Sequence, residues 1–313
     1  DKMPAYFPPE KLQFFDETGG VGVEFSKLPF DHLLFTGSGT TGRAVMAAAA
    51  QNLCPVTLEL GGKAPAVVCD DFPLATAAER ILFVKCLNAG QICTAVDHVF
   101  VPRAQVDEFA KLAAQIVPQR YPRLDSPDYT SIVDQRSFDR LVGAMDDARS
   151  RGATLINLID SGPAHDRASR KIAPHVVLNA PWDSELLKRE IFGPILPLVA
   201  YDTLDEVIAR INSGPRPLAL YPFSHDNARI ERLLTHVMSG GVSINDALFH
   251  VGQHDLPFGG IGDSGMGHYH GREGFETFSK LRPIFHQARL SSVGLLAPPY
   301  GRLAERMLAF LMR

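Results

Sequence analysis

Short apolar runs alternate with amphipathic stretches along most of the chain, and the two periodicities predict strands and helices in turn. Buried strands are predicted at residues 32–37, 55–60, 65–70, 98–102, 175–179, 195–201, 218–224 and 240–245. Helices are predicted at residues 43–53, 73–89, 106–117, 138–152, 204–212 and 228–238. Strands that alternate with helices favour mainly parallel sheets with crossover helices, so the pattern predicts an α/β protein.

Composition and charge narrow the class of protein. The chain has 313 residues, of which 45% are hydrophobic and 21% charged, and its net charge is −4. This balance is typical of a globular protein with room for two domains, and it gives no basic field for nucleic acid. No apolar run reaches the roughly 18 residues that a membrane-spanning helix needs. Four cysteines without a C-x-x-C pair favour reduced thiols and a cytoplasmic protein.

A glycine-rich turn follows the first predicted strand. The stretch FTGSGTTGR places Gly37, Gly39 and Gly42 in a G-x-G-x-x-G pattern before a predicted helix. Such a turn can hold a phosphate at the helix N-terminus, and it can equally be a tight turn without a ligand. Glu59 lies 22 positions after Gly37 (59 − 37), where a dinucleotide-binding fingerprint places the carboxylate that binds the ribose.

Glu59 has a second interpretation because it stands in LELGGK, at the end of an apolar strand and before two glycines. Burial there would raise the pKa of its carboxyl group and make it a usable base near neutral pH. The plainer alternative is a solvated carboxylate paired with Lys63. The residues alone leave these alternatives open.

Cys93 ends the polar stretch LNAGQIC between two apolar segments. It could be a buried spacer, half of a disulfide, a metal ligand or a nucleophile. For a nucleophile, we expect nearby N–H groups to lower the thiol pKa from about 8.5 towards about 4–7. The other cysteines are expected to be buried and inert: Cys54, Cys69 and Cys86.

Histidines and aromatic residues gather near the C-terminal third of the chain. The histidines are His250, His254, His268 and His270. A metal site there is conceivable, but the surrounding glycines favour a loop with ordinary histidines, and no metal is predicted. Three aromatic residues are candidates either for an apolar substrate pocket or for core packing: Phe249, Phe258 and Tyr269.

Four motifs in one order resemble the aldehyde dehydrogenase superfamily: LELGGK, GQIC, EIFGP and PFGG. The stretches PLALYPFS and SGGVSINDALFH, and the segment that begins at LPFGG, are closest to its class-3 branch, which includes fatty-aldehyde and coniferyl-aldehyde dehydrogenases. The resemblance covers roughly residues 31 to 285, and four motifs in register make chance an unlikely origin.

The resemblance implies an aldehyde dehydrogenase-like α/β fold with three parts. Residues 1–60 would be the end of a Rossmann-type cofactor domain, and residues 61–262 a complete catalytic domain. Residues 263–313 would hold an oligomerisation strand and an amphipathic tail. The family's P-W-N segment is not found in the sequence, so we expect an N-terminally truncated chain that binds cofactor poorly and is nearly inactive.

The resemblance also implies roles for individual residues. Cys93 becomes the nucleophile, and Glu59 becomes the general base rather than the ribose ligand. The residues expected to contact NAD or NADP are Gly37, Ser38, Gly39, Thr40, Thr41, Gly42, Leu60, Glu190 and Phe192. The implied reaction oxidises an aromatic aldehyde such as coniferyl aldehyde, or a medium- or long-chain aliphatic aldehyde, to the acid through a thiohemiacetal and a thioester. Hydrolysis rather than transfer to coenzyme A is favoured by the presence of Glu59. The alternative is an inactive fragment or pseudoenzyme that acts only as an assembly partner.

Two C-terminal segments predict partners. Residues 275–285, FETFSKLRPIF, resemble the strand that this family pairs across subunits, which implies a homodimer. Residues 300–313 predict an amphipathic helix with apolar residues on one side and arginines between them. Such a helix fits docking on its own or a partner subunit, and it also fits peripheral contact with a membrane surface.

Overall fold

The computed structural model describes residues 2–16, 21–159, 162–291, 294 and 297–312. Its contacts divide the chain into two compact units, Asp1–Phe278 and Ser279–Arg313.

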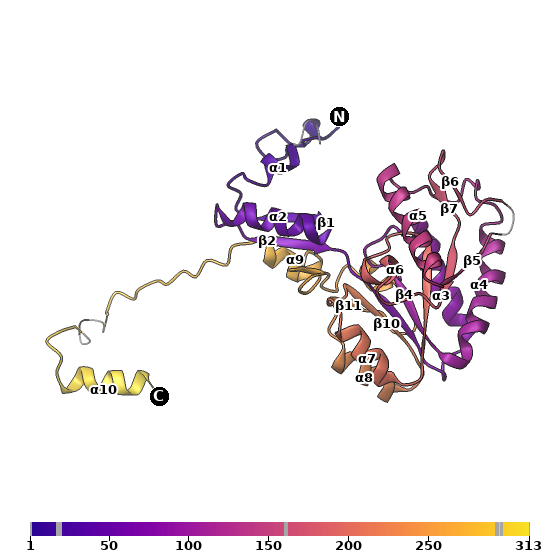
Figure 1. The fold of residues 1–313 in the computed structure, drawn as a ribbon. Coiled ribbons are helices and arrows are strands. Elements are labelled where there is room, and N and C mark those ends of the chain that lie inside the picture. The colour runs from indigo at the N-terminus through magenta and orange to yellow at the C-terminus, as the bar shows by residue number, and fades with distance from the viewer. Residues whose placement is uncertain (1, 17–20, 160–161, 292–293, 295–296, 313) are drawn as a thin grey trace. The chain divides into compact units, whose positions relative to one another are not determined.

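A seven-stranded sheet is the largest sheet described in the first unit (Figure 1). Its strand order is β11 (Gly241–Val242), β10 (Ala219–Phe223), β3 (Pro65–Val68), β4 (His98–Pro102), β9 (Ile195–Tyr201), β8 (His175–Leu178) and β5 (Thr154–Asn157). Neighbouring strands are parallel except at the edge, where β5 runs antiparallel to β8. The mainly parallel sheet confirms the predicted α/β class.

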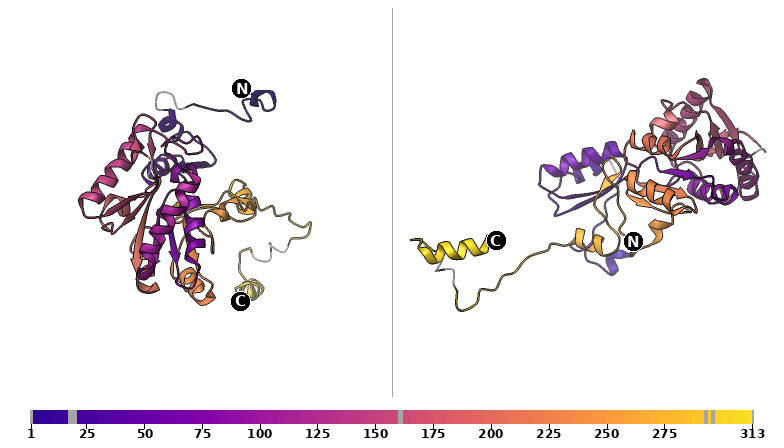
Figure 2. Two further views of the ribbon diagram at one scale, coloured as in Figure 1. Left: turned by 90° about the vertical axis from the view of Figure 1, so that its right-hand side faces the viewer. Right: turned by 90° about the horizontal axis from the view of Figure 1, so that it is seen from below.

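Helices cover both faces of this sheet, as Figures 1 and 2 show. One face carries α3 (Leu74–Cys86), α4 (Val106–Arg120) and α5 (Gln135–Ser150), and the other carries α7 (Leu204–Asn212) and α8 (Asn227–His236). Successive strand residues point to opposite faces, so Val99 and Val101 join the first core whereas Phe100 joins the second.

A separate sheet of three strands holds the glycine-rich turn. Its order is β1 (Leu33–Gly37), β2 (Val56–Leu60) and β12 (Gly265–Met266). Strands β1 and β2 are parallel and joined by α2 (Gly39–Ala50), while β12 runs antiparallel to β2. The core of this sheet is small and consists of four buried residues: Leu33, Val45, Ala49 and Cys54.

Shorter elements complete the described residues. They are η1 (Met3–Ala5), α1 (Val21–Phe25), η2 (Leu87–Gly90), η3 (Arg103–Gln105), β6 (His165–Asp166), β7 (Lys171–Ile172), α6 (Glu185–Lys188), η4 (Phe249–Gly252) and α9 (Gly271–Thr277). In the second unit, α10 (Arg302–Leu311) forms within the predicted amphipathic stretch and exposes Leu303, Phe310 and Leu311. Among the described residues, no helix is long and apolar enough to cross a membrane.

The predicted elements form, with corrections at several ends. The helix predicted at 43–53 begins earlier, at Gly39, because the Ser38 hydroxyl accepts a hydrogen bond from the Thr41 amide at 3.3 Å and caps it. The helix predicted at 73–89 ends at Cys86, since Asn88 and Ala89 adopt positive φ angles of 49° and 51°.

Two predicted strands differ more from the structure of the single chain. The strand predicted at 240–245 shortens to Gly241–Val242; opposite its continuation lies Pro222, which has no N–H to extend the ladder. Residues 275–285 form no strand within the chain, because α9 occupies the start of the segment and residues 278–285 are irregular. The pairing of this segment with a second subunit stays a prediction. A strand needs a neighbour for its backbone hydrogen bonds, and no described strand pairs with this segment.

Candidate active site

Glu59 lies on β2, the central strand of the small sheet, opposite Thr36 of β1 and Gly265 of β12. It is only 4% exposed, and neither carboxyl oxygen has a hydrogen-bond partner among the described residues. Burial raises the pKa of Glu59 to about 8, as predicted. Lys63 forms an ion pair with Asp97, so the predicted alternative of a Glu59–Lys63 pair is wrong.

The loop before Cys93 is tightly built. Asn88, Ala89 and Gly90 all have positive φ, and a side chain on Gly90 would place its Cβ 2.3 Å from the Gly193 carbonyl oxygen. The loop that carries GQIC therefore touches the EIFGP segment directly. The Gln91 side chain also holds the loop in place, because its Oε1 atom accepts a hydrogen bond from the backbone amide of Val133 at 2.9 Å.

Cys93 is half-buried, whereas the other three cysteines are buried, and all four are free thiols. Its pKa is raised by burial first, then by the charges of Glu190 and Glu59, against backbone N–H groups that lower it. The expected lowering of the thiol pKa is thus wrong for this structure, because burial and two carboxylates outweigh the N–H groups. The same interactions show that Cys93, Glu59 and Glu190 share one electrostatic environment.

Glu190 completes this group of side chains. A Cβ on Gly61 would lie 2.0 Å from its Oε2 atom, so its carboxylate sits directly against the LELGGK turn. Burial and the charge of Asp97 raise its pKa to about 7, against the opposing effects of the Gly62 amide and of Lys63. Burial thus raises the pKa of two carboxyl groups, Glu59 to about 8 and Glu190 to about 7, and the charges of both act on the Cys93 thiol.

A buried ionic network fixes the loop that carries Glu190. Asp97 is 3% exposed, pairs with Lys63 and accepts a hydrogen bond from the Ile191 amide at 2.9 Å. The Lys63 ammonium also donates to the carbonyls of Leu186 at 2.9 Å and Arg189 at 3.0 Å. Sequence analysis missed Asp97, although an acidic residue at the entrance of an apolar strand was a usable signal.

The glycine-rich turn lies at the start of α2, as predicted. Ser38 caps the helix, and Gly42 packs so closely on Leu60 that a Cβ would meet its Cδ2 atom at 2.6 Å. Thr40 and Thr41 are exposed beside this helix N-terminus. Leu60 is 4% exposed, so its side chain serves the contact between α2 and β2.

Two partly exposed aromatic residues are linked to this group of side chains: Phe192 follows Glu190 in EIFGP, and Tyr269 is affected by the charges of Glu59 and Cys93. Phe192 is 38% exposed and has a φ of 49°. Tyr269 is 37% exposed. Burial raises the pKa of its hydroxyl group, and the charges of Glu59 and Cys93 raise it further. Its ring meets that of Phe258 edge-on, with centroids 5.6 Å apart. Phe249 makes a separate aromatic contact: its ring stacks on that of Phe83, with centroids 6.4 Å apart.

The histidines do not form a metal site in the part of the chain that the structure describes, where no cluster of three or more potential ligands occurs. His250 shares a hydrogen bond of 2.9 Å with the Ser243 hydroxyl, and burial lowers its pKa to about 4. His254 and His270 lie edge-on with ring centroids 5.6 Å apart.

Comparisons with known proteins give this geometry its context. The aldehyde dehydrogenase family matches residues 5–284. A "Probable coniferyl aldehyde dehydrogenase" of Pseudomonas aeruginosa is 49% identical over 308 residues, which are 98% of this chain and 64% of that protein. The "Coniferyl aldehyde dehydrogenase" of a Pseudomonas species is 43% identical over 96% of this chain and 65% of its own length. The chain thus spans just under two thirds of these relatives.

Solved structures of aldehyde dehydrogenases are also similar to this chain. The structure titled "Substrate bound state of Staphylococcus Aureus AldH" matches with a TM-score of 0.89 and 37% identity, over 98% of this chain and 66% of that chain. Betaine aldehyde dehydrogenase of Staphylococcus aureus, in complex with NAD+, matches with a TM-score of 0.73 and 28% identity, over 82% of this chain and 52% of that one. The predicted resemblance is confirmed, and the chain belongs to the aldehyde dehydrogenase family.

Proposed function

We propose that this chain carries the chemistry of an NAD(P)-dependent, hydrolytic aldehyde dehydrogenase. The observation that carries the proposal is a buried Glu59 carboxyl group that has no hydrogen-bond partner among the described residues and lies in the same electrostatic environment as the half-buried Cys93 thiol. Buried polar groups normally have partners, and exceptions call for an explanation. A role in binding and deprotonating a water molecule would explain why this carboxyl group has no protein partner.

Cys93 acts as the nucleophile. Its thiolate attacks the aldehyde carbonyl carbon and forms a thiohemiacetal oxyanion, which backbone N–H groups near the sulfur can stabilise. The Tyr221 hydroxyl donates to the Thr94 carbonyl at 2.5 Å and holds the backbone that follows the nucleophile. The sulfur is therefore presented from a fixed loop rather than from a mobile one.

Glu59 acts as the base in the second half of the reaction. Once the thioester has formed on Cys93, Glu59 takes a proton from water, the hydroxide adds to the acyl carbon, and the thiolate leaves. A base is effective when its pKa lies near the working pH, and burial brings Glu59 to about 8. The pKa of an exposed glutamate, about 4.3, would make it a far weaker base.

The residues around the turn fit a dinucleotide. The N-terminus of α2 is capped by Ser38 alone and exposes Thr40 and Thr41, which suits a pyrophosphate. Glu190 and Phe192 would hold the nicotinamide ribose and ring beside Cys93. When bound, NAD or NADP supplies the acceptor for the aldehyde's hydride. The contacts assigned to Gly37, Gly39, Gly42 and Leu60 belong to the same proposal.

The substrate we propose is an aromatic aldehyde such as coniferyl aldehyde, or a medium- or long-chain aliphatic aldehyde. Support comes from the names of the two Pseudomonas relatives and from Tyr269, a partly exposed ring that feels the charges of Cys93 and Glu59. A flat ring offers an apolar wall to a planar substrate. The competing proposal is a chain that acts only as an assembly partner. It gives no reason for a partly exposed thiol and a buried carboxyl group that has no partner among the described residues.

Further parts of the proposal concern organisation. We place the end of the cofactor domain at residues 1–60, the catalytic domain at 61–262 and the assembly region at 263–313. The protein would act as a cytoplasmic homodimer that pairs through residues 275–285. Residues 300–313 would dock on a subunit or touch a membrane surface, which their exposed leucines and arginines both permit.

Acylation by p-nitrophenyl acetate tests the proposal without any cofactor. The unaltered chain should release nitrophenolate and turn over, because Glu59 hydrolyses the acetyl-enzyme. Glu59→Gln should accumulate a protein with one added acetyl group on Cys93, visible by mass spectrometry, and turn over at least about 100-fold more slowly. Cys93→Ala should form no adduct, while Cys54→Ala serves as the control that keeps full activity.

The outcome separates the two proposals. An acetyl group on Cys93 that accumulates only in Glu59→Gln supports the enzyme. If the unaltered chain, assayed with folding confirmed by circular dichroism, is never acylated on Cys93, the assembly-partner proposal replaces it.

A further inference from the structure

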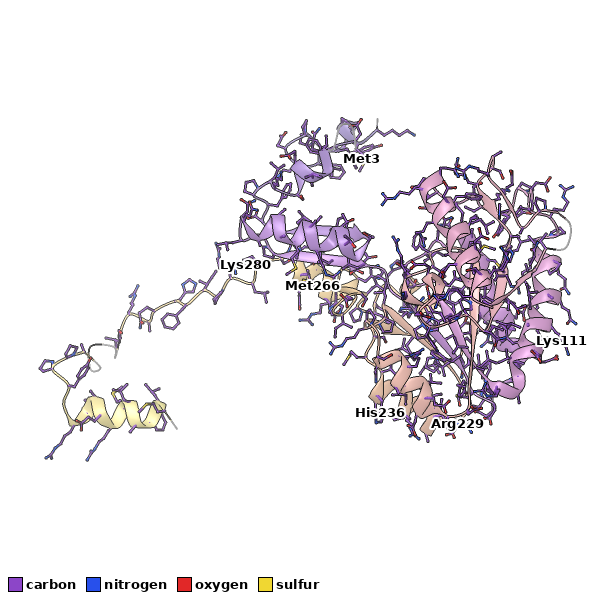
Figure 3. The ribbon with its side chains drawn as sticks, in the orientation of Figure 1. Met3, Lys111, Arg229, His236, Met266 and Lys280 are labelled. Carbon is purple, nitrogen blue, oxygen red and sulfur yellow. The ribbon has the colours of Figure 1, made fainter. Side chains whose placement is uncertain are left out.

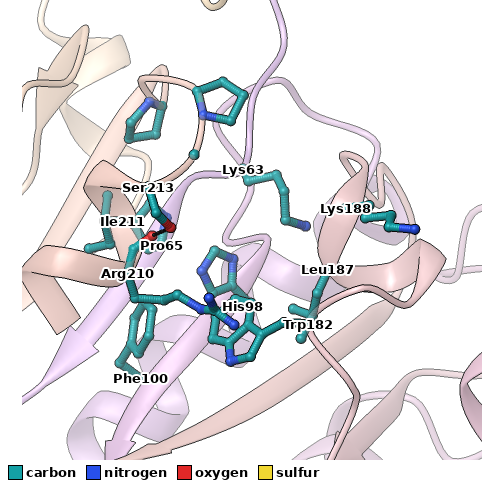
Figure 4. Close-up of a pocket in the computed structure, with 13 residues that line it drawn as sticks. Lys63, Pro65, His98, Phe100, Trp182, Leu187, Lys188, Arg210, Ile211 and Ser213 are labelled. Carbon is teal, nitrogen blue, oxygen red and sulfur yellow. Dashed lines mark hydrogen bonds between the residues drawn. The ribbon is translucent and has the colours of Figure 1, made fainter. Parts of the chain in front are cut away.

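A cavity of about 230 Å³ opens beside the N-terminal ends of β3 and β4, on the face that α7 covers (Figure 4). We infer that this cavity is a binding site for a small aromatic carboxylate, separate from the catalytic thiol. Its thirteen lining residues do not include Cys93, Glu59 or Glu190. The inference therefore does not depend on the proposed reaction.

The walls of the cavity are largely apolar and include two rings. Phe100 and Trp182 lie nearly parallel, at an angle of 28° with centroids 6.2 Å apart. The remaining apolar lining comes from Pro65, Leu187, Ile211, Pro215 and Pro217. Flat apolar walls in a cavity of this size suit a single aromatic ring rather than a long chain.

The charged side chains that line the cavity are all cationic. Three cations line it, Lys63, Lys188 and Arg210, and none of its described lining residues is Asp or Glu. Lys63 is already engaged by Asp97 and two carbonyls. Lys188 and Arg210 make no side-chain hydrogen bond or ion pair with any described residue. They are the cations available to a ligand.

Arg210 is held in place for such a ligand. Its guanidinium carbon lies 3.5 Å from the centroid of Trp182, a cation–π contact that fixes the group, while its N–H donors have no acceptor in the part of the chain that the structure describes. Figure 4 shows Arg210 reaching in towards Trp182, with Lys188 on the other side of the cavity. A guanidinium group binds a carboxylate through two parallel hydrogen bonds, and an ammonium group across from it adds attraction.

Trp182 makes the site directly measurable, because it is the single tryptophan of the chain. The test titrates the 313-residue chain with 3-phenylpropanoate and follows tryptophan fluorescence, with calorimetry as a second measurement. We expect a saturable change with one ligand per chain. The neutral analogue 3-phenylpropan-1-ol and the ringless propanoate should each bind at least about tenfold more weakly, since each lacks one half of the recognition.

Variants assign the binding to these side chains. Arg210→Gln and Lys188→Gln should each raise the dissociation constant about tenfold or more. Lys111→Gln, which removes an exposed lysine of α4 on the opposite face of the sheet (Figure 3), should leave it unchanged. Cys93→Ala should also bind normally, because the thiol does not line the cavity.

Several results would overturn the inference. They are an absence of saturable binding, equal affinity for the alcohol and the acid, or unchanged affinity in Lys188→Gln. Lys188 is exposed, so its replacement should not disturb folding, and the test remains decisive if Arg210→Gln unfolds. Loss of binding in Cys93→Ala but not in Lys188→Gln would place the ligand in the catalytic cleft instead.

Discussion

The two sheets of the first unit differ sharply in how they are supported. The seven-stranded sheet has helices on both faces and the larger buried core, whereas among the described residues the three-stranded sheet packs against α2 with a core of four buried residues. Leu34 on β1 is 45% exposed, Met46 on α2 is 43% exposed, and Leu53 is 91% exposed. Local stability follows buried apolar contact, so the small sheet should open more readily than the large one.

The proposed chemistry is divided between these sheets. Cys93 and Glu190 precede β4 and β9 of the large sheet, while Glu59 stands on β2 of the small one. The thiol and the base are therefore held by regions of unequal stability. Changes near Cys93 should affect the whole unit, whereas changes in the small sheet should act locally.

Gly90→Ala should have the largest effect. A methyl group at this position would meet the Gly193 carbonyl oxygen at 2.3 Å, and φ of 72° is unfavourable for alanine. We expect the free energy of unfolding to fall by roughly 2 to 4 kcal/mol in urea denaturation, since neither backbone segment can move aside easily.

Gly143→Ala is the matched control for this prediction. Gly143 lies within α5, and a Cβ there would meet nothing within 4 Å. Because alanine favours a helix over glycine, this variant should be stabilised by up to about 1 kcal/mol. Equal destabilisation by both substitutions would show that the loop before Cys93 is not held rigidly against the Gly193 backbone.

Glu59→Gln should have an effect that approaches this size only at high pH. The folded carboxyl group has a pKa of about 8, against about 4.5 when unfolded. Between these values the folded state keeps a proton that the unfolded state has lost, so the free energy of unfolding falls as pH rises from about 4.5 to about 8. Glutamine does not ionise, so the variant does not lose stability in this way. It should be more stable than the unaltered chain by roughly 2 to 4 kcal/mol at pH 9, with little difference near pH 4.5.

Urea denaturation across this pH range measures the difference. Glu231→Gln, at an exposed position of α8, should show no such trend. If the gain appears in hydrogen exchange of β2 alone and not in global unfolding, then the small sheet unfolds as a unit of its own. A pH-independent difference would mean that Glu59 is ionised in the folded state.

Much of the fold could be predicted from periodicity. The strands of the large sheet are apolar on both faces, so continuous apolar runs such as 195–201 could be identified as buried strands from the sequence alone. What could not be predicted was structure that depends on a neighbour. The segment FETFSKLRPIF has strand-like composition, but β structure requires a partner strand, and none pairs with it among the described residues.

The candidate site was predictable in its members and less so in its electrostatics. Motif order singled out Cys93, Glu59 and Glu190, and the structure brings these residues together. The direction of the Cys93 pKa was not predictable, because it depends on which carboxylates approach it in space. Asp97 was missed for the same reason, since its role follows from contacts with residues 34 and 94 positions away in sequence.

The smallest effect is expected from Ser38→Ala, which removes the cap of α2 in the small sheet. Loss of a capping hydrogen bond costs about 1 kcal/mol, and here it should speed amide exchange in the first turn of α2 while the urea midpoint of the unit stays almost unchanged. Asp134→Ala removes the equivalent cap of α5, where the Asp134 carboxylate accepts from the Ser137 amide at 2.7 Å. Because α5 packs on the large sheet, that loss should lower the midpoint itself. If the two variants shift the midpoint equally, the sheets unfold together, and the stability of the base is tied to that of the nucleophile.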